Sequence, residues 1–357
     1  MDQKTARAFN RVVTNSGYRA FHLAFGEGNL DHVRWAEHVE GLADPLRGLV
    51  RLFLLQQKLV PARVQALLGT EITAALIAAQ ILDGDGDSLR SRMVLNNFRS
   101  LLFFHEHGPH PGVYFGDDSV ALGIYQTPTF GGITLDLCSG SAIQAMISAH
   151  KGSRAYSVEI NPYAAAIARI NVMINALDHK VVVVNRSLEA FANEVQEKLD
   201  LVTFNPPLLP VPESLDFPLV GHGGVDALEV TRRALRAYLP HVNDGGAIEF
   251  IGTGLGVGGH PSSFDELAKL AAEYDTSLHA QLLHRAPLRR GTRLYDILVS
   301  TAAVNNGIPV GLCHEVFSLH FEKLGMTDLW LFFVRGTRGQ VQPARVTDLG
   351  RPSFWFI

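Results

Sequence analysis

The feature that most constrains the fold is a regular alternation of short apolar runs with helical patterns, which begins after Gly132. Apolar runs typical of buried strands are separated by stretches in which apolar residues recur at helix spacing. Strands are expected at residues 133–137, 155–160, 181–184, 199–204 and 247–251, and helices at 142–150, 162–177, 227–239 and 264–274. Strands that alternate with helices in this way form βαβ units, so an α/β, Rossmann-like fold with a parallel sheet is predicted. In such a sheet the active site lies at the carboxyl ends of the strands.

The first hundred residues lack this alternation. Helix-spaced apolar residues run from residue 5 to about residue 102, which predicts a helical N-terminal domain over 1–107 and a catalytic domain over 108–357. The stretch 107–132 is rich in glycine, proline and aromatic residues and is expected to be a connector with short β-like pieces. Near the C-terminus, residues 277–283, 294–301 and 329–334 look strand-like, and 315–324 looks helical.

The charge and the hydropathy of the chain limit which partners and which cellular location are expected. The chain has 357 residues, with 31 Lys and Arg against 35 Asp and Glu, a net charge of −4. Long polyanions are held by many cationic side chains, so this balance counts against a large nucleic acid as a partner. The trio Arg289, Arg290 and Arg293 is interpreted as a solvated loop. No stretch reaches the about 18 apolar residues of a membrane span, and the N-terminus lacks a secretion signal, so a cytoplasmic location without membrane contact is expected.

The residues that bind metals in other proteins do not form a site in this sequence. Cys138 and Cys313 do not form a CxxC pair, which argues against a thiolate zinc site and a disulfide framework. His105, His107 and His110 straddle a helix end and a Gly-Pro turn without a firm ligand spacing. No metal is therefore expected.

A first candidate site follows the strand at 133–137. Asp136 ends this strand, and the small residues Cys138, Ser139, Gly140 and Ser141 make a tight turn into the next helix. Small side chains let a ligand approach the backbone, and a helix N-terminus offers free N–H groups. The carboxylate beside the turn suits a cationic or amino-bearing ligand.

A second candidate site follows the strand at 155–160. Glu159, before Ile160, lies about twenty residues beyond the first turn, where a carboxylate accepts hydrogen bonds from ribose hydroxyls. Asn161 precedes Pro162 and can cap the following helix by itself, which leaves Glu159 available for a ligand.

A third candidate site is Asn205-Pro206-Pro207 at the end of the strand at 199–204. Two prolines stiffen the turn and hold the asparagine amide in a fixed direction. Such an amide can accept an N–H of a substrate through its carbonyl oxygen.

At these residues the chain resembles class I S-adenosylmethionine-dependent methyltransferases of the Asn-Pro-Pro type, which include the release-factor glutamine methyltransferases. The motif DLCSGSA is similar to their cofactor loop, SVEINPYAAAIARI to their acidic strand end and helix, and TFNPPL to their catalytic motif. The later GGVDAL and the Gly pair at 245–246 also fit the family. The resemblance covers residues 112–251.

The resemblance implies a role for each motif. S-adenosylmethionine is the implied cofactor, with Asp136, Cys138, Ser139, Gly140 and Ser141 around its methionine part and Glu159 and Ile160 at its ribose. Asn185, Arg186, Ser187 and Leu188 would lie against its adenine. Asn205 would orient the attacking group, with Pro206 and Pro207 shaping the mouth of the site, while Asp117 and Asp118 align loosely with a loop on the cofactor side.

Two positions depart from the family pattern. The family usually has an acid where Ser187 stands, and a tyrosine or phenylalanine where Leu208 stands. In the family that ring stacks on a planar amide or base, which leucine cannot do, so this position argues against methylation of a glutamine side chain or a nucleobase. The function predicted from the sequence is methyl transfer to a small molecule or to an amino or amide nitrogen. The alternative is a cyclase of the azetidine-2-carboxylate synthase type, which closes the cofactor's own chain and releases methylthioadenosine.

A glycine pattern near residue 254 also allows a different class of function. The pattern Gly254-x-Gly256-x-x-Gly259 matches a dinucleotide-binding loop, which would suit an NAD-dependent oxidoreductase, but no acidic strand end follows it. The stretch is instead interpreted as a flexible loop at the rim of the site, before a helix capped by Ser263 and Glu266. A non-catalytic interaction protein that keeps the fold is the remaining alternative.

Overall fold

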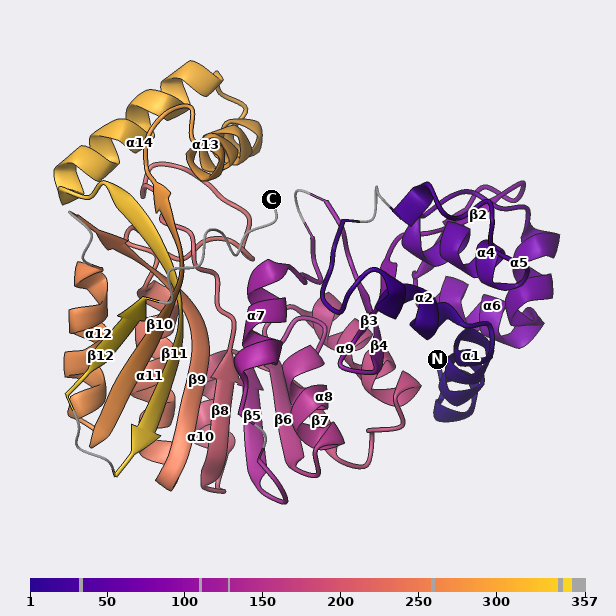
Figure 1. Ribbon diagram of the computed structural model, residues 1–357, viewed down its shortest axis with the longest axis horizontal. Helices are drawn as coiled ribbons and strands as arrows, with labels where there is room; N and C mark the ends of the chain where they lie inside the picture. The colour runs from indigo at the N-terminus through magenta and orange to yellow at the C-terminus, as the bar shows by residue number, and fades with distance from the viewer. Residues whose placement is uncertain (32–34, 109–110, 128, 258–260, 340–342, 349–357) are drawn as a thin grey trace. The chain divides into compact units, whose positions relative to one another are not determined.

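The computed structural model describes residues 1–31, 35–108, 111–127, 129–257, 261–339 and 343–348 (Figure 1). The chain divides into two compact units, and each is built from two stretches of sequence. The first unit contains Met1–Gly116 and Ser139–Asn185, and the second contains Asp117–Cys138 and Arg186–Ile357. The chain therefore passes from one unit to the other three times.

The first unit joins a mainly helical N-terminal part to a strand–helix–strand segment. Its core gathers Phe9, Trp35, Phe53 and Phe104 with Ile167 and Ile170 of the helix that follows the second motif. Its elements are α1 (Gln3–Asn15), α2 (Tyr18–Ala24), α4 (Leu46–Leu49), a π-helical turn (Val50–Leu54), α5 (Pro61–Leu68), α6 (Thr70–Ala78), β1 (Leu82–Gly84), β2 (Leu89–Ser91), β3 (Val94–Phe98), β4 (Leu101–His105), α8 (Ile143–His150), β6 (Arg154–Glu159), α9 (Pro162–Ile174) and β7 (Val181–Asn185).

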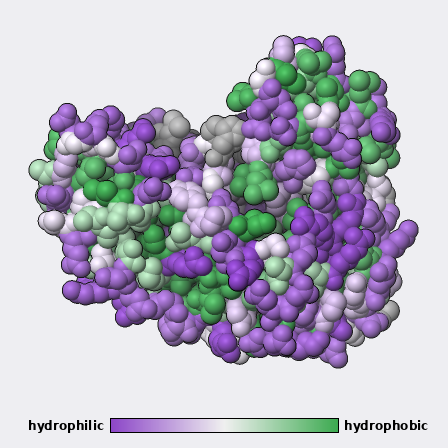
Figure 2. Space-filling model, turned by 180° about the vertical axis from the view of Figure 1, so that it is seen from behind, coloured by the Kyte–Doolittle hydropathy of each residue, from purple (hydrophilic) through white to green (hydrophobic). Residues whose placement is uncertain are grey.

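The second unit carries most of the large sheet. Its elements are α7 (Asp117–Tyr125), β5 (Ile133–Leu137), α10 (Leu188–Glu194), β8 (Leu199–Phe204), α11 (Glu229–Tyr238), a 3-10 turn (Leu239–His241), β9 (Val242–Gly256), α12 (Ser262–Ala272), β10 (Thr276–Pro287), α13 (Arg293–Asn306), α14 (Val310–Leu324), β11 (Asp328–Arg338) and β12 (Arg345–Asp348). In Figure 2 hydrophobic residues appear among hydrophilic ones on the α13–α14 pair, at the upper right of the view. Exposed apolar side chains of these helices include Val304 and Leu319.

The large sheet has eight strands in the order β12-β10-β11-β9-β8-β5-β6-β7. β5, β8 and β9 run parallel to one another, as do β6 and β7, whereas β11 is antiparallel to both of its neighbours. The predicted α/β, Rossmann-like fold class is therefore confirmed. The strands and helices predicted between residues 133 and 274 are all present, and most of them differ from the prediction by no more than three residues at either end. The strand predicted at 247–251 is the middle of a longer strand, β9, and α10 was not predicted.

The prediction of helix throughout residues 5–102 is wrong in its last part, which contains β1 to β4. β3 and β4 form a hairpin whose turn residues, Arg99 and Ser100, have φ angles of 51° and 62°. Two consecutive positive φ angles match the type I′ turn, which sequences usually mark with Asn-Gly. Arg-Ser carries no such mark. The connector at 107–132 likewise contains a helix, α7, rather than only β-like pieces.

Two C-terminal predictions are also wrong. Residues 294–301 belong to α13, whose buried residues Tyr295, Leu298, Val299, Ala302 and Ala303 show the helical period only in a window that extends past residue 301. The stretch expected to be a glycine-rich rim loop is instead the end of β9, paired with β11 up to Gly256. Its glycines make room for neighbours, because a Cβ on Gly252 would meet the Phe332 ring at 2.9 Å. Gly259 lies outside the described residues.

The position of the domain boundary at residue 107 stays a prediction. No helix in the described ranges combines the length and the apolar character needed to cross a bilayer.

Candidate functional site

The first motif begins at the carboxyl end of β5, where Asp136 is almost fully buried. Asp136 is paired in register with Thr203 of β8. The Thr203 hydroxyl lies 3.3 Å from Asp136 Oδ1 and 3.4 Å from the Leu135 carbonyl oxygen, and can donate to either. The parallel pairing of two apolar strands thus fixes a carboxylate at the end of the strand. After it, Cys138 adopts a φ of 52°, which begins the turn.

The turn itself, in the first unit, is held by its own backbone and by β6. The Ser139 N–H donates to the Val158 carbonyl at 3.2 Å, and the Ser157 hydroxyl donates to Ser139 Oγ at 2.7 Å. Gly140 has a φ of 49°, and a Cβ there would lie 3.4 Å from the Tyr114 carbonyl oxygen. The buried Ser141 hydroxyl has no hydrogen-bond partner within the described part of the chain. A buried hydroxyl without a partner is uncommon in a folded protein.

The second motif places Glu159 at the carboxyl end of β6, with 8% of its surface exposed. Its Oε2 accepts the Gly140 N–H and its Oε1 accepts the Asn161 N–H, both at 2.8 Å. Burial raises the pKa of Glu159 above its ordinary value, although the backbone donors act in the opposite direction. The predicted cap is confirmed, because the Asn161 side chain accepts the Tyr163 N–H at 3.0 Å. Glu159 is therefore not needed as a cap.

The residues expected near adenine fall on both sides of the end of β7. The Asn185 amide donates to the carbonyl oxygens of Glu159 and Ile160, at 2.8 and 3.0 Å. Ile160 exposes 56% of its surface, which leaves an apolar side chain available to a flat ligand.

In the second unit, the Ser187 hydroxyl accepts the Ala190 N–H at 3.2 Å and so caps α10. Arg186 pairs with Glu194 at 3.1 Å, and the Leu188 side chain is buried. The serine that departs from the family pattern thus has a structural role as the cap of α10.

The third motif places Asn205 directly after β8. Its Nδ2 donates to the Ser119 hydroxyl of α7 at 3.1 Å, and its buried Oδ1 has no partner among the described residues. Ser119 Oγ lies 3.4 Å from Asp118 Oδ1, so the serine can give its proton to Asp118 and accept from Asn205. These two hydrogen bonds, from Asn205 to Ser119 and from Ser119 to Asp118, assign Nδ2 of the Asn205 amide to the side of Ser119 and Oδ1 to the opposite side.

The prolines and the following leucine support this geometry. Pro206 is buried and Pro207 is half-buried. Leu208, which stands where the family has a ring, is buried in a cluster with Leu122, Ile251 and other apolar residues. The Leu208 carbonyl accepts the Thr253 hydroxyl.

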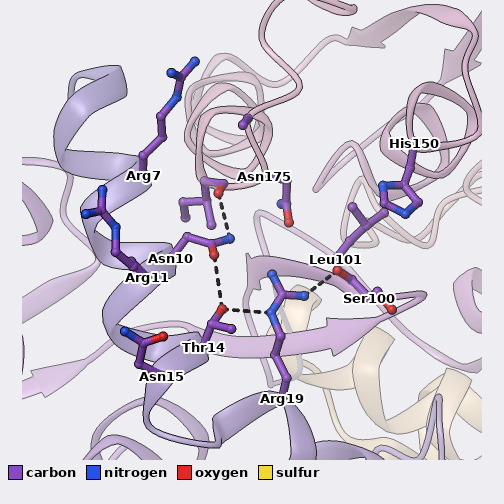
Figure 3. A pocket seen from close by; sticks show the side chains of 12 residues that line it. Arg7, Asn10, Arg11, Thr14, Asn15, Arg19, Ser100, Leu101, His150 and Asn175 are labelled. Carbon is purple, nitrogen blue, oxygen red and sulfur yellow. Dashed lines mark hydrogen bonds between the residues drawn. The ribbon is translucent and has the colours of Figure 1, made fainter.

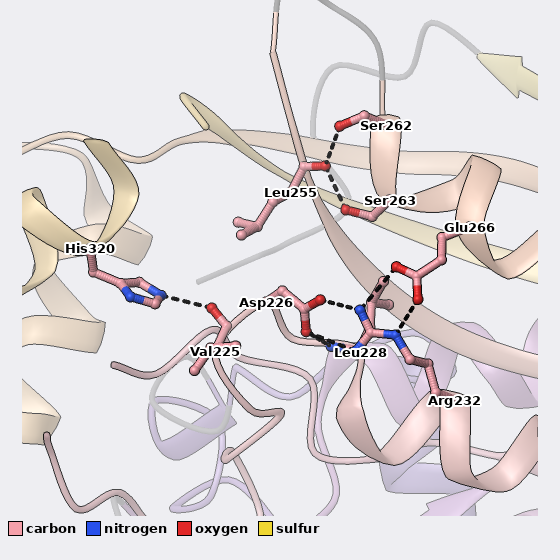
Figure 4. Close-up of polar contacts among 9 residues, drawn as sticks. All are labelled: Val225, Asp226, Leu228, Arg232, Leu255, Ser262, Ser263, Glu266 and His320. Carbon is pink, nitrogen blue, oxygen red and sulfur yellow. Dashed lines mark hydrogen bonds and ion pairs between the residues drawn. The ribbon is translucent and has the colours of Figure 1, made fainter. Parts of the chain in front are cut away.

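The aspartate of the GGVDAL motif takes part in an ion-pair network with two helices (Figure 4). Arg232 of α11 donates to both oxygens of Asp226 and also to Glu266 of α12. The predicted capping pair of Ser263 and Glu266 is wrong, because Pro261 precedes α12 as its N-cap residue. Glu266 is instead held by Arg232, and the Ser263 hydroxyl donates to the Leu255 carbonyl at 2.7 Å.

The structure thus gathers the predicted residues in two groups, one in each unit. The turn at Ser139 and Gly140 joins Glu159, Ile160 and Asn185 in the first unit, and the second unit holds Asp136 and Asn205. Sequence reasoning missed Ser157, Thr203 and Ser119, and gave Asp118 only a loose alignment. No local pattern marks them, since Ser119 lies 86 positions from the amide it contacts. The described residues contain no cluster of His, Cys, Asp or Glu that could hold a metal, and His110 lies outside them.

Parts of the chain are similar in sequence to known proteins. Residues 20–92 match the family described as "Domain of unknown function (DUF7059)". A ribosomal protein uL3 glutamine methyltransferase of Bradyrhizobium diazoefficiens is 36% identical over 152 residues, 40% of this chain and 47% of that protein. A Methanocaldococcus jannaschii protein with the provisional name protein N5-glutamine methyltransferase is 27% identical over 41% of this chain and 75% of its own length.

A tRNA1(Val) (adenine(37)-N6)-methyltransferase of Histophilus somni is 25% identical over 29% of this chain and 45% of its own length. Among solved structures, Trm5 of Methanocaldococcus jannaschii in complex with adenosine gives a TM-score of 0.42 at 13% identity, over 71% of this chain and 59% of Trm5. The match thus spans about half the length of the first curated relative.

These names overturn the expectation of a small-molecule substrate and of an unlikely large nucleic acid, because the named relatives act on proteins and on tRNA. The expectation about nucleic acid used the net charge of the whole chain, which averages over the surface and does not report a local basic region. The coarser prediction of a class I methyltransferase fold is confirmed: the chain has the predicted sheet and is similar in sequence to named methyltransferases.

Proposed function

We propose that the chain is an S-adenosylmethionine-dependent methyltransferase that methylates a planar nitrogen of a macromolecule, with the glutamine amide of a protein as the favoured acceptor. The observation that carries the proposal is the buried Oδ1 of Asn205, which has no partner in the described chain while its Nδ2 is held by Ser119. The glutamine acceptor is favoured, against the argument from Leu208, by the names of the first two relatives, which match 152 and 158 residues of this chain, compared with 107 for the tRNA methyltransferase.

The residues fit the proposed cofactor. When bound, S-adenosylmethionine supplies a methyl group on a positively charged sulfur. Each carboxylate oxygen of Glu159 accepts one backbone N–H and keeps a second lone pair for a ribose hydroxyl. The unpaired Ser141 hydroxyl and the close backbone at Gly140 suit a polar ligand in the turn. The carboxylate of Asp136 offsets the charge of an amino group.

Asn205 acts on the acceptor. Its Oδ1 accepts one N–H of the acceptor amide, which orients the nitrogen and increases its electron density. Methyl transfer to this nitrogen would leave the cofactor as the thioether adenosylhomocysteine, and the methylated nitrogen would lose one proton to solvent. The contact from Asn205 to Ser119 keeps the Asn205 amide from rotating. Asn205 therefore contributes to the rate mainly by positioning the acceptor.

The test supplies methyl-labelled S-adenosylmethionine with two separate acceptors, ribosomal proteins extracted from the source organism and total tRNA. The expected result is adenosylhomocysteine together with labelled methylglutamine in the protein digest. The Asn205→Ala variant should lower kcat by about 10²-fold, the scale found when one positioned polar group is removed from an active site, with cofactor affinity unchanged. Ser119→Ala should lower kcat less, because the amide stays but is less well fixed.

Four outcomes would contradict the proposal. If calorimetry detects no binding of S-adenosylmethionine, the assignment of the cofactor is wrong. Methylthioadenosine formed without an acceptor shows cyclisation of the cofactor instead. Label in tRNA adenine alone moves the acceptor from glutamine to a base. An unchanged rate in Asn205→Ala removes the role of the amide.

A further inference from the structure

The first unit contains a second candidate site, an open pocket of about 450 Å³ (Figure 3). It is formed by α1, the start of α2, the turn between β3 and β4, and the ends of α8 and α9. The lining residues are Arg7, Asn10, Arg11, Thr14, Asn15, Arg19, Ser100, Leu101, His150, Ile174, Asn175 and Ala176. None of the candidate methyl-transfer residues is among them.

The pocket has an excess of positive charge. Three arginines and a histidine line it, and its lining contains no carboxylate. Arg7 makes one ion pair, 3.8 Å from Asp178, with half of its side chain exposed, which is a weak interaction. Arg11 has no ion pair within the described ranges. The charge of these side chains is therefore largely unbalanced.

Arg19 is the most confined of these cations. It donates to Thr14 Oγ1 at 3.1 Å, to Asn97 Oδ1 at 3.2 Å and to the Ser100 carbonyl, all of them neutral acceptors. Its guanidinium is partly buried against these uncharged groups, and this burial lowers the pKa of Arg19 from its ordinary value. An anionic ligand would supply the missing charge.

The pocket is also held in shape before a ligand arrives. The Asn10 amide donates to the Ile174 carbonyl at 2.8 Å, and the Thr14 hydroxyl donates to Asn10 Oδ1 at 3.2 Å. Figure 3 shows the hydrogen bonds continuing from Thr14 to Arg19 and on to Ser100. A fixed polar surface binds a ligand with a smaller loss of conformational entropy.

The size and composition of the pocket narrow the class of anion. Arg7 and Arg11 are four residues apart on α1, so their Cβ atoms are about 6 Å apart, and two anionic groups in a row can bind them. Asn, Thr and Ser side chains add hydrogen-bonding groups for sugar hydroxyls. Apart from His150, the lining residues carry no ring on which a base could stack. These features suit repeated phosphates and sugars better than a base or a single carboxylate.

We propose that this pocket binds the phosphodiester backbone of a nucleic acid, without reading its bases. The binding is independent of the methyl-transfer site and does not rest on the proposed methyltransferase activity. The net charge of the whole chain is −4, so this locally basic pocket is not evident from the composition.

The test measures fluorescence anisotropy of the full chain with labelled single-stranded RNA of mixed sequence, without cofactor and over a range of salt concentrations. The double variant Arg7→Gln/Arg11→Gln should bind more weakly, and the slope of log affinity against log salt should fall by about 1.4, about 0.7 for each lost phosphate contact. The matched control is Arg289→Gln/Arg290→Gln, which removes the same charge from an exposed stretch of the second unit. This control should bind RNA as the unmodified chain does.

Each outcome decides the proposal. Binding of single-stranded DNA with similar affinity supports recognition of the backbone alone, whereas a preference for RNA adds the sugar hydroxyl. Equal weakening in both double variants would show a general charge effect and would overturn the proposal, as would unchanged binding in Arg7→Gln/Arg11→Gln. Equal or tighter binding of polyglutamate would assign the pocket to acidic peptides. Unchanged calorimetric binding of S-adenosylmethionine to both variants separates this result from failure of the proposed function.

Discussion

The carboxylate of Glu159 lies between two backbone donors and is almost fully buried, so its protonation state is sensitive to its surroundings. Because burial raises its pKa above the ordinary 4.5, protonation begins at a higher pH than for an exposed glutamate. The proposed ribose contact needs the ionised form, since a protonated carboxyl offers fewer acceptors. Cofactor affinity should therefore fall as pH drops from neutral towards 4.5.

The measurement is calorimetric titration of S-adenosylmethionine at a series of pH values in that range. Glu159→Ala should weaken binding by about 10- to 100-fold, the scale of a hydrogen bond to a charged group, and should remove the pH dependence that Glu159 contributes. An exposed acid such as Glu273 provides the matched control through Glu273→Ala, which should leave both unchanged. An unmodified chain whose affinity does not change with pH would rule out Glu159 as the titrating group.

At the scale of elements, Asn171 of α9 and Asn175, the C-cap residue of that helix, take the place of a neighbouring strand for β4. The fully buried Asn171 accepts the Phe104 N–H at 2.8 Å and donates to the Phe104 carbonyl at 3.0 Å. One turn later, Asn175 accepts the Leu102 N–H at 3.0 Å and donates to the Leu102 carbonyl at 2.6 Å. A helix thus satisfies backbone groups that would otherwise be buried without partners.

Asn171→Ala should lower the free energy of unfolding by about 3 kcal/mol, because it leaves buried polar groups of the backbone unpaired. Asn175→Ala is the matched variant and should cost less, since Asn175 is only half-buried and water can replace its amide. Urea unfolding followed by circular dichroism measures both. Equal costs would show that burial does not set the difference, and no loss in Asn171→Ala would contradict the pairing.

Local patterns predicted the elements that carry the candidate site. The end of β6, the cap at Asn161 and the end of β8 just before Asn205 depend on neighbouring residues, and these were predicted correctly. The β3–β4 hairpin was missed because Arg99 and Ser100 are not residue types that usually mark such a turn. The strand at Gly252 was missed because glycines usually indicate a loop, whereas here the missing side chain makes room for the Phe332 ring. The contact from Asn205 to Ser119 depends on tertiary packing, which a local pattern does not record.

At the scale of the whole chain, the core of the N-terminal part is not made by N-terminal residues alone. Ala164, Ile167, Ile170 and Ile174 of α9 are buried in the same cluster as Phe9 and Phe104. Burial of an isoleucine side chain contributes about 1.5–3 kcal/mol, so the three isoleucines of α9 together contribute an amount comparable with the net stability of a small domain.

A fragment of residues 1–107 is therefore expected to lack a cooperative unfolding transition, whereas the full chain should show one. Urea titration with circular dichroism makes the comparison. A fragment that unfolds cooperatively, with helix content in proportion to its length, would instead support residue 107 as the limit of an independent domain.

The asparagine pairing on β4 has one further consequence, for solubility. A strand whose N–H and C=O groups are open at the edge of a hairpin can pair with a strand of another molecule and begin aggregation. In this chain the side chains of Asn171 and Asn175 occupy the groups of Phe104 and Leu102. The two amides therefore protect a strongly apolar strand, LLFFH, from intermolecular β-pairing while the protein is folded.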